Sequence, residues 1–520
     1  MSLLELDLPE RYNASDVLFR NLDAGRGDKT AVLCGDSRTS YAELAATAAR
    51  VGNGLRDLGL PRGARVLLLL LDTPAFPAAF FGALRAGYLP IPVNTVLQTD
   101  DYAYLLRDSG AGALIVDGAL YPRVEPVRGR CPDLDQVIAV GAGGAPDVHD
   151  WGAWLEAAGT ELEPAPTGPD EPAFWLYSSG STGHPKGVVH LHRSIPYTLA
   201  TYAEQVLGIR EDDLVFSASK AFHAYGLGNS LSFPFGAGAA CVLFPGRPTP
   251  EAVFAEIARH RPTLFFTVPT LYAAMLAAAA GDPDYGLGRV RRCVSAGEAL
   301  PADVYRRFHQ RFGVEILDGI GSTELLHIFI SNRPGEVRPG TSGRAVPGYE
   351  AEVLDEDGRP AAAGESGDLL VRGGSATTGY WQKPEKTAAT LREGRVFTGD
   401  RYRQDEDGFF HYEGRSDDML KVGGQWVSPI EVENTLIEHP AVLECAVVAA
   451  RDGDGMEKPK AFVVLCAGHG GSPELAAELQ AFVKSKIAPY KYPRRIEFRA
   501  ELPKTVTGKI QRFLLRDSCP

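Results

Sequence analysis

The sequence predicts an α/β protein with a large N-terminal part built on parallel sheets and a smaller α+β domain at the C-terminal end. Up to about residue 340, short apolar runs alternate with longer amphipathic stretches, which indicates parallel strands covered by helices. Beyond that point, short strands separated by Gly/Asp turns indicate a compact β subdomain. From Asp417 the pattern changes again, and a segment of about a hundred residues has the size of a separate domain.

The elements of the N-terminal part are predicted in chain order from their apolar runs. Strands are expected at Arg65 to Leu71, Gly112 to Asp117, Gln136 to Val140 and Leu264 to Val268. Helices are expected from Ala75 to Ala86, with Gly87 as the C-cap, and from Leu271 to Ala280.

The same criteria place the later elements. In the β subdomain, strands are expected at Glu350 to Asp355, Asp368 to Arg372 and Phe409 to Glu413. After Asp417 we expect a hairpin at KVGGQWV, a helix from Pro429 to His439, strands at Glu444 to Ala450 and Ala461 to Leu465, and a helix from Pro473 to Ile487. The predicted domains are therefore residues 1–416 and 417–520.

Composition excludes several classes of protein. The 53 basic and 66 acidic residues give a net charge of −13, which repels a nucleic-acid backbone. The seven cysteines are odd in number and unpaired in spacing, so free thiols in a reducing compartment are expected. The longest apolar run near the N-terminus, Val66 to Leu71, is far shorter than the ~20 residues that cross a bilayer. We expect a cytoplasmic protein, a monomer or homodimer, with no nucleic-acid or membrane partner.

The sharpest motif is YSSGSTGHPKGVVH, from Tyr177 to His190, which follows a strand-like FWLY. Its glycines let the backbone approach a ligand, its hydroxyl and N–H groups can donate to phosphate oxygens, and Lys186 adds a cation. A Walker A loop is excluded because Lys186 follows a proline and precedes Gly187. A flexible surface loop has a similar composition, so this motif alone leaves both interpretations open.

A second motif, DGIGSTE, runs from Asp318 to Glu324 and continues as LLHIFISN. A carboxylate at the end of a Gly-rich loop can hold Mg²⁺ beside phosphates. An Asp-Gly turn before a helix cap at Thr323 accounts for the same residues without a metal, so the alternative stays open.

Two further segments complete the set. TGD at Thr398 to Asp400 and GRSDD at Gly414 to Asp418 offer an Asp and an Arg, which can grip a ribose diol or form a surface ion pair. LPKTVTGKI places Lys509 after a glycine near the C-terminal end, where an isolated lysine is usually a solvated charge.

In this order and at these separations, the four segments resemble the adenylate-forming superfamily of acyl-CoA synthetases, adenylation domains and luciferases, over essentially the whole chain. Within it, GSTELLHIFISN and AYGLGN, Ala224 to Asn229, are similar to the benzoate–CoA ligase family. The resemblance implies a large N-terminal domain of two parallel-type αβ sheets plus a β-barrel-like subdomain, and a small mobile C-terminal domain. It also implies an AMP-forming acid–thiol ligase that uses ATP, Mg²⁺ and coenzyme A.

The resemblance assigns the nucleotide site residue by residue. The loop with Ser178, Ser179, Ser181, Thr182 and Lys186 is similar to the motif that binds the β- and γ-phosphates. Gly297, Glu298 and Ala299 resemble the adenine wall, and Asp318, followed by Gly319 and Ile320, matches the residue that meets the adenine amino group. Thr323 matches the α-phosphate donor, Glu324 the Mg²⁺ ligand, and Asp400 with Arg415 the ribose contacts.

The remaining implied roles concern the second domain and the acid. Lys509 matches the catalytic lysine of the first half-reaction, Asp417 the hinge, and Gly423 with Gly424 the glycines of the pantetheine tunnel. The acid would meet a flat site formed by Ala224, Tyr225, Gly226, Gly297, Gly321, His327 and Ile328, with His223 either contacting a ring substituent or gating the carboxylate.

The resemblance therefore implies a two-step reaction. The acid carboxylate attacks the α-phosphate of MgATP to give an aryl-adenylate and pyrophosphate, and the CoA thiol then displaces AMP after the small domain rotates about Asp417. His223 could donate to or accept from an ortho substituent, so 2-aminobenzoate (anthranilate) is expected first, with benzoate or hydroxybenzoate next.

Three alternatives stay open at this point. An adenylation enzyme could load the thiol of a free-standing carrier protein instead of CoA; no attached carrier segment is expected after Lys509. A second alternative is a non-catalytic nucleotide-binding protein, which would have no need for Lys509. The third is a kinase-like enzyme, which is disfavoured because the segment from Tyr177 to His190 does not match the Walker A motif.

Overall fold

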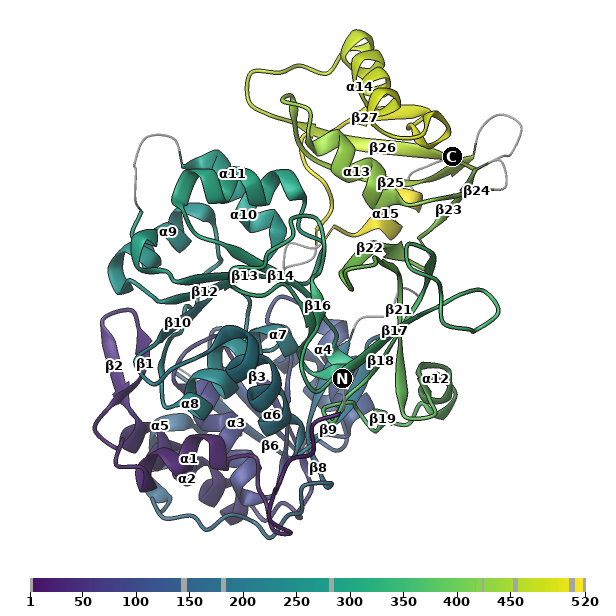
Figure 1. The fold of residues 1–520 in the computed structure, drawn as a ribbon. Coiled ribbons are helices and arrows are strands. Elements are labelled where there is room, and N and C mark those ends of the chain that lie inside the picture. The colour runs from purple at the N-terminus through teal and green to yellow at the C-terminus, as the bar shows by residue number, and fades with distance from the viewer. Residues whose placement is uncertain are drawn as a thin grey trace.

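Parallel strands form the centre of two sheets in the N-terminal region (Figure 1). The computed structural model describes residues 3–141, 147–178, 184–279, 285–416, 418–422, 425–451, 457–504 and 510–517. The first sheet has the order β4 (Leu89–Pro92), β3 (Arg65–Leu69), β5 (Ala113–Asp117), β6 (Gln136–Val140), β7 (His149–Asp150). All its neighbouring strands pair in parallel, as the unbroken apolar runs predict.

The second sheet carries most of the residues of interest. Its order is β16 (Arg344–Ala345), β15 (Ile328–Ser331), β14 (Ile316–Gly321), β13 (Arg292–Ser295), β12 (Leu264–Thr267), β10 (Leu214–Ser217), β11 (Ala240–Val242), β1 (Thr30–Cys34), β2 (Ser37–Ser40). Strands β10 to β14 run parallel, and β15, β16 and β2 add antiparallel edges.

Helices cover both sheets. They are α1 (Asp16–Asp23), α2 (Tyr41–Asp57), α3 (Ala75–Ala86), α4 (Thr99–Ser109), α5 (Trp151–Ala157), α6 (Ser194–Thr198), α7 (Ala224–Leu227), α8 (Phe233–Ala237), α9 (Pro250–His260), α10 (Pro269–Ala278) and α11 (Ala302–Phe312). Shorter or wider turns are η1 (Tyr121–Arg123), η2 (Glu125–Arg130), η3 (Leu199–Leu207), η4 (Gly228–Ser232), η5 (Leu287–Arg289) and η6 (Thr323–Leu325). None of the helices that the structure describes is long and apolar enough to cross a membrane.

A small antiparallel sheet joins the two parallel ones. It has the order β19 (Gly379–Tyr380), β9 (Lys186–Leu191), β8 (Pro172–Ser178). Its face buries Phe174 against Phe80 of α3, with ring centroids 5.4 Å apart. The β8–β9 hairpin, which carries the motif of hydroxyls and glycines, is therefore fixed to the core.

The predicted β subdomain is an antiparallel sheet. Its order is β17 (Glu350–Leu354), β18 (Ser366–Arg372), β21 (Arg395–Gln404), β20 (Leu391–Arg392), with β22 (Phe410–Arg415) on β21 and the helix α12 (Pro384–Thr390) beside it.

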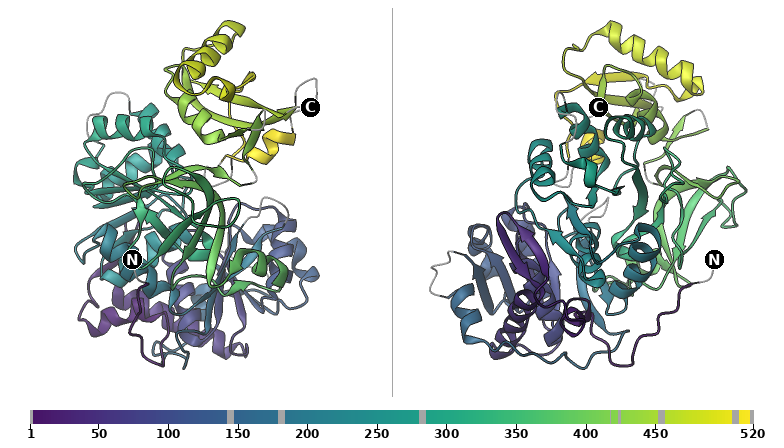
Figure 2. Two further views of the ribbon diagram at one scale, coloured as in Figure 1. Left: turned by 45° about the vertical axis from the view of Figure 1, so that its right-hand side comes forward. Right: turned by 60° about the vertical axis from the view of Figure 1, so that its left-hand side comes forward.

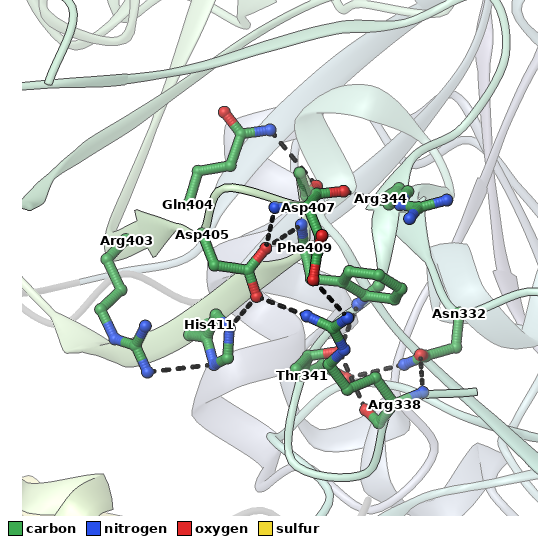
Figure 3. Close-up of polar contacts among 12 residues, drawn as sticks. Asn332, Arg338, Thr341, Arg344, Arg403, Gln404, Asp405, Asp407, Phe409 and His411 are labelled. Carbon is green, nitrogen blue, oxygen red and sulfur yellow. Dashed lines mark hydrogen bonds and ion pairs between the residues drawn. The ribbon is translucent and has the colours of Figure 1, made fainter. Parts of the chain in front are cut away.

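A network of charged side chains anchors the β21–β22 hairpin to the loop after β15 (Figure 3). Arg338 donates to Asp405 at 2.8 Å and to Asp407 at 2.7 Å, and its guanidinium lies 3.9 Å from the centre of the Phe409 ring. Nε2 of His411 lies 2.8 Å from Oδ2 of Asp405, the same oxygen that Arg338 contacts. The strand that leads to Asp417 is thereby fixed to the large sheet.

The C-terminal part has its own sheet and core. The strands β23 (Leu420–Val422) and β24 (Gln425–Val427) form a hairpin. A second sheet contains β25 (Val442–Arg451), β26 (Glu457–Leu465) and β27 (Arg495–Phe498). The helices are α13 (Pro429–Ile437), α14 (Pro473–Lys486) and α15 (Arg512–Asp517), with the turn η7 (Pro489–Lys491). Both views in Figure 2 show this part above the large region, and α13 contacts α11 and β22.

The predicted elements are present, with shifted ends. The helix at Ala75 to Ala86 ends at Gly87 with φ +84°, as the C-cap prediction requires. Strand β3 ends two residues before the predicted Leu71, and α10 begins at Pro269 rather than Leu271 because proline suits the first helical turn. The expected α/β fold, with a large N-terminal and a small C-terminal domain, is confirmed.

Candidate active site

Three of the predicted site segments lie at one edge of the second sheet. Because β10, β12, β13 and β14 run parallel, their carboxyl ends lie at the same edge, where ligands bind in open α/β sheets. The segments that follow these strands carry the residues singled out from the sequence: His223 to Gly226 after β10, Gly297 to Ala299 after β13, and Asp318 to Glu324 in and after β14.

Asp318 is a buried carboxylate with an unused acceptor. Oδ2 accepts a 3.3 Å hydrogen bond from the backbone N–H of Leu300, whereas Oδ1 has no hydrogen-bond partner among the described residues. Burial raises the pKa of Asp318 to about 8, and the nearby Ser295 hydroxyl and backbone N–H groups only partly offset that effect. A buried acceptor without a donor suits a ligand that brings an N–H group.

The segment after β13 contacts the C-terminal part of the chain. Gly297 has φ +94°, a left-handed conformation that favours glycine. Oε1 of the next residue, Glu298, accepts a 3.0 Å hydrogen bond from the backbone N–H of Ile510. The residue that directly follows Lys509 is therefore in contact with the predicted adenine wall, while Ala299 is half-buried beside it.

The described ends of the phosphate motif lie on adjacent strands. Ser178 ends β8 and pairs with Lys186, which begins β9. Oγ of Ser178 is buried with no described hydrogen-bond partner, and partial burial lowers the pKa of Lys186, with Glu324 acting in the opposite direction. The predicted phosphate-binding residues Ser179, Ser181 and Thr182 lie outside the described residues.

Glu324 and Thr323 form the turn η6 after β14. Oγ of Ser322 accepts from Leu325 N–H at 3.3 Å and caps the turn, and Nε2 of buried His190 donates to the carbonyl of Thr323 at 2.9 Å. Oε1 of Glu324 accepts a 2.8 Å hydrogen bond from the hydroxyl of Tyr380. These contacts fix the turn from three sides.

A single carboxylate such as Glu324 fits Mg²⁺ that arrives with nucleotide phosphates. Mg²⁺ is usually held by one or two carboxylates together with phosphate oxygens and water. The described residues include no group of three His, Cys, Asp or Glu that would hold a metal alone. The donor set therefore fits MgATP better than a resident metal.

Asp400 and Arg415 face each other across the β21–β22 ladder. Nη1 of Arg415 donates to Oδ1 of Asp400 at 3.1 Å and to the carbonyl of Thr398 at 2.9 Å. Gly399 has φ +72°, and a Cβ there would lie 2.7 Å from Nη2 of Arg415, so glycine is favoured beneath the guanidinium. The surface ion pair considered from the sequence is thus present, on a nearly buried Asp400.

Aromatic rings and glycines form the predicted acid site. The ring of His327 lies 5.6 Å from that of Tyr225 and 4.5 Å from that of Phe233. Its Nε2 donates to Oδ1 of Asn229 at 3.1 Å, and burial lowers the pKa of His327 to about 3, so the ring is neutral. The hydroxyl of Tyr225 donates towards the carbonyls at the ends of β12 and β13.

Glycines allow backbone and ring atoms to pack closely around these rings. A Cβ at Gly226 would lie 2.0 Å from the carbonyl oxygen of Lys220, and one at Gly228 would lie 2.4 Å from Cδ2 of His327. A Cβ at Gly321 would meet the His327 backbone at 2.7 Å, and one at Gly319 the Ile330 carbonyl at the same distance. A side chain at any of these positions would displace backbone or ring atoms.

The other predicted acid-site residues lie close by in the chain. Ala224 and Ile328 are buried, whereas His223 is half-buried at the start of α7, with its ring 4.5 Å from that of Phe222. Ile320 is half-buried in β14 and packs against the core. Lys509, Asp417, Gly423 and Gly424 lie outside the described residues, so their roles stay predictions.

Two family models match the chain. The AMP-binding enzyme model matches residues 19–381, and the model of the AMP-binding enzyme C-terminal domain matches residues 431–509. The chain belongs to the AMP-binding enzyme family. The expected membership of the adenylate-forming superfamily is confirmed, and with it the reaction class of an acid–thiol ligase.

Several of the most similar relatives are named as aryl-acid CoA ligases. Benzoate–CoA ligase from Thauera aromatica is 52% identical over 520 residues, which cover 99% of this chain and 97% of that protein. Among solved structures, the anthranilate CoA ligase AuaEII in complex with anthranoyl-AMP has a TM-score of 0.95 and 44% identity, with 98% of both chains covered. A benzoate CoA ligase from Burkholderia xenovorans LB400 has a TM-score of 0.91 and 48% identity, covering 97% of this chain and all of that one.

Sequence reasoning missed three residues that touch the site residues. These are His190, which holds Thr323, Asn229, which holds His327, and Tyr380, which holds Glu324. His190 and Asn229 are the last residues of two of the quoted motifs, so their position in those motifs could have marked them as site residues. Tyr380 had none, because it lies between two of those motifs and belongs to neither.

Proposed function

We propose that the protein is an ATP-dependent aryl carboxylate–CoA ligase that acts on benzoate and its small ortho-substituted forms, anthranilate among them. The observation that carries this proposal is the hydrogen bond from Ile510 to Glu298, which brings the neighbour of Lys509 to the sheet edge where Asp318 and Glu324 lie. The named activities of the relatives support the same class of substrate.

In the first half-reaction an oxygen of the acid carboxylate attacks the α-phosphorus of ATP. The bond to the bridging oxygen breaks, and pyrophosphate leaves. Lys186 binds the phosphates and Thr323 donates to the α-phosphate. Lys509 contacts the attacking oxygen and the α-phosphate, where its charge offsets the negative charge of the transition state. Mg²⁺ held by Glu324 would neutralise the departing pyrophosphate.

The adenine and the ribose of the nucleotide are held by separate residues in this proposal. The adenine amino group donates to the unused Oδ1 of Asp318, and the ribose hydroxyls contact Asp400 and Arg415. A donor placed on a buried carboxylate that lacks a partner removes the cost of leaving that group unsatisfied, about 1–3 kcal/mol.

The second half-reaction needs another arrangement of the C-terminal domain, residues 417–520. Rotation about Asp417 breaks the Ile510–Glu298 contact, withdraws Lys509 and brings Gly423 and Gly424 to the acyl-adenylate. The CoA sulfur then attacks the acyl carbonyl, the thiol proton is released, and the carbon–oxygen bond to AMP breaks.

The aryl ring lies between Tyr225, His327 and the glycines 226, 228 and 321. This set carries no charge, because the imidazole of His327 is neutral and the Tyr225 hydroxyl is bound to backbone carbonyls, which favours an uncharged ring over an aliphatic acid with a second carboxylate. Cytoplasmic location follows in the same proposal, supported by the six described cysteines, all of which are free.

The test is a product assay on the purified protein with MgATP and a panel of benzoates, with and without CoA, read by mass spectrometry. Aryl-CoA and AMP are expected, and the ratio of kcat/KM for benzoate and anthranilate then names the preferred acid. Formation of aryl-AMP without any CoA thioester would indicate that the acceptor is the thiol of a carrier protein instead of CoA. Absence of any aryl-AMP would overturn the proposal.

A further inference from the structure

Tyr380 contacts two oppositely charged residues of the site. Its hydroxyl donates to Oε1 of Glu324 at 2.8 Å, and Nζ of Lys186 lies 4.2 Å from the centre of its ring. Lys186 and Glu324 form no ion pair with each other among the described residues. One side chain therefore separates a cation from a carboxylate and holds both.

The position of Tyr380 is fixed by its strand. In β19, Tyr380 pairs with Val188 of β9, next to Gly187, so the ring reaches the residues that follow the phosphate loop. The backbone N–H of Tyr380 donates to Oγ1 of Thr387 at 3.0 Å. Tyr380 is only 6% exposed, and its hydroxyl lies 2.8 Å from Oε1 of Glu324, an oxygen that can only accept, so the hydroxyl is the donor.

The segment after Tyr380 is tied to the β8–β9 hairpin through Asp108. Lys383 pairs with Oδ1 of Asp108 at 3.2 Å, and Nε1 of Trp381 donates to the Asp108 carbonyl at 3.1 Å. The hydroxyl of Tyr177, the residue before Ser178, donates to Oδ2 of Asp108 at 2.8 Å. Movement of Tyr380 is thus coupled to the hairpin that carries the phosphate motif.

These contacts leave one oxygen of Glu324 for a metal. A tyrosine hydrogen bond on Oε1 orients the carboxylate, as partners behind metal ligands generally do, and leaves Oε2 as the ligand. The ring face attracts the ammonium of Lys186 without neutralising it. A direct ion pair between Lys186 and Glu324 would instead consume the two charges that the phosphates and their metal need.

We propose that Tyr380 is a positioning residue for adenylation: its hydroxyl orients Glu324 towards the metal of MgATP, and its ring holds Lys186 for the phosphates. This rests on the proposed function for the identity of the nucleotide and its metal. It assigns Tyr380 no contact with the acid and none in the thioester step.

The test compares Tyr380→Phe, which removes only the hydroxyl, with Tyr380→Leu, which also removes the ring. Tyr88→Phe is the matched control, because it deletes a buried hydroxyl that donates to the Leu60 carbonyl at 3.1 Å, away from the site. In ATP–pyrophosphate exchange with benzoate, Tyr380→Phe is expected to raise the Mg²⁺ concentration for half-maximal rate about 10- to 100-fold, the usual effect of removing a partner behind a metal ligand. Tyr380→Leu is expected to raise the KM for ATP as well.

A binding measurement supplies a readout that does not depend on turnover. Mn²⁺ is titrated by electron paramagnetic resonance into each variant with ATP and no acid, and Tyr380→Phe is expected to bind Mn²⁺ at least about tenfold more weakly than wild type and Tyr88→Phe. Thioester formation from supplied benzoyl-AMP and CoA should stay within twofold of wild type.

Unchanged Mg²⁺ and Mn²⁺ dependence in Tyr380→Phe would overturn the inference. Equal loss in both half-reactions, with a melting temperature lowered beyond that of Tyr88→Phe, would overturn it too, since Tyr380 would then be structural. Failure of the wild type to form any aryl-AMP would refute the proposed function instead, and the Mn²⁺ titration would still decide the role of Tyr380.

Discussion

The backbone N–H of Ile510 donates a 3.0 Å hydrogen bond to Oε1 of Glu298, which links the last stretch of the chain to the loop after β13. The same stretch is anchored on its other side by Arg512, which forms a bidentate pair with Glu433 of α13. Residues 510–512, which follow Lys509, thus contact both the large region and the rest of the C-terminal domain. A rotation of that domain would break the first contact and keep the second.

Lys509→Ala is expected to lower the rate of aryl-AMP formation by about 100-fold or more, because a charge placed at the transition state contributes on that scale. Thioester formation from supplied aryl-AMP should be nearly unchanged, since the proposed domain rotation would withdraw Lys509 in that step. Rapid-quench measurement of each half-reaction checks this. Lys504→Ala, which removes a charge paired with Glu444, is the control, and equal loss in both half-reactions would refute the assignment.

Asp417→Pro is expected to slow the exchange between the two proposed arrangements, because proline would fix φ at the predicted hinge residue. Each half-reaction measured in isolation should change unequally, and the overall reaction should become limited by the domain motion. Stopped-flow fluorescence with both substrates follows the exchange. Normal rates in both half-reactions would show that the hinge lies elsewhere.

The stability of the unliganded protein is expected to depend on Asp318. Its pKa is raised from 3.8 to about 8 in the folded protein, so the unfolded chain loses the proton first. The contribution of Asp318 to stability is complete below about pH 4 and is lost as the pH rises through about 8, at about 1.4 kcal/mol for each pKa unit. Asp318→Asn does not titrate, so its melting temperature should fall less than that of wild type between about pH 5 and about pH 9. Parallel curves would contradict the assignment.

Arg512→Ala is expected to destabilise the C-terminal domain by about 2–4 kcal/mol, because it leaves the carboxylate of Glu433 buried without its cation. The backbone N–H of Val447 remains as a donor to Glu433 at 2.7 Å, and Arg512 is itself 21% exposed, which keeps the loss below that of a fully enclosed pair. Urea unfolding measures the difference. Arg516→Ala, on the same helix and paired with Asp418 near the surface, should cost less than about 1 kcal/mol.

Gly228→Ala is expected to weaken use of the aryl acid without affecting ATP. The added Cβ would lie 2.4 Å from the His327 ring, which then moves towards the acid. We expect kcat/KM for benzoate to fall about tenfold, because a misfit of about one methylene group in an apolar pocket changes kcat/KM on that scale. The KM for ATP should stay constant. Gly129→Ala serves as a control for adding a methyl group at a glycine with open space around it. An equal rise in both KM values would place His327 outside the acid site.

The sequence predicted the architecture well because apolar runs and their spacing report burial directly. The ends of β3 and α10 moved because tertiary contacts and a proline, rather than hydrophobicity, set them. The roles of Asp318, Glu324, Asp400 and Arg415 were assigned through the family resemblance of the motifs that carry them, and those roles remain predictions.

The supporting contacts were not predictable in the same way. Tyr380 reaches Glu324 only because β19 pairs with β9, and a two-residue strand leaves almost no periodic signal. Asn229 and His327 are held together by the packing of η4 against the turn after η6, which no local pattern encodes. The contact of Glu298 with Ile510 depends on how two domains are placed, and the sequence alone specifies that placement weakly.

The pairing of β19 with the β8–β9 hairpin also has a consequence for the rate at which the enzyme folds. The two parallel sheets grow largely from strands that follow one another along the chain, whereas Tyr380 has to close a very long loop before it can reach Val188. Contacts between residues so far apart in the chain form slowly, because the chain loses the entropy of loop closure before the new contacts stabilise the fold. During refolding, helical signal should therefore return ahead of ATP-dependent turnover, with a measurable lag between the two.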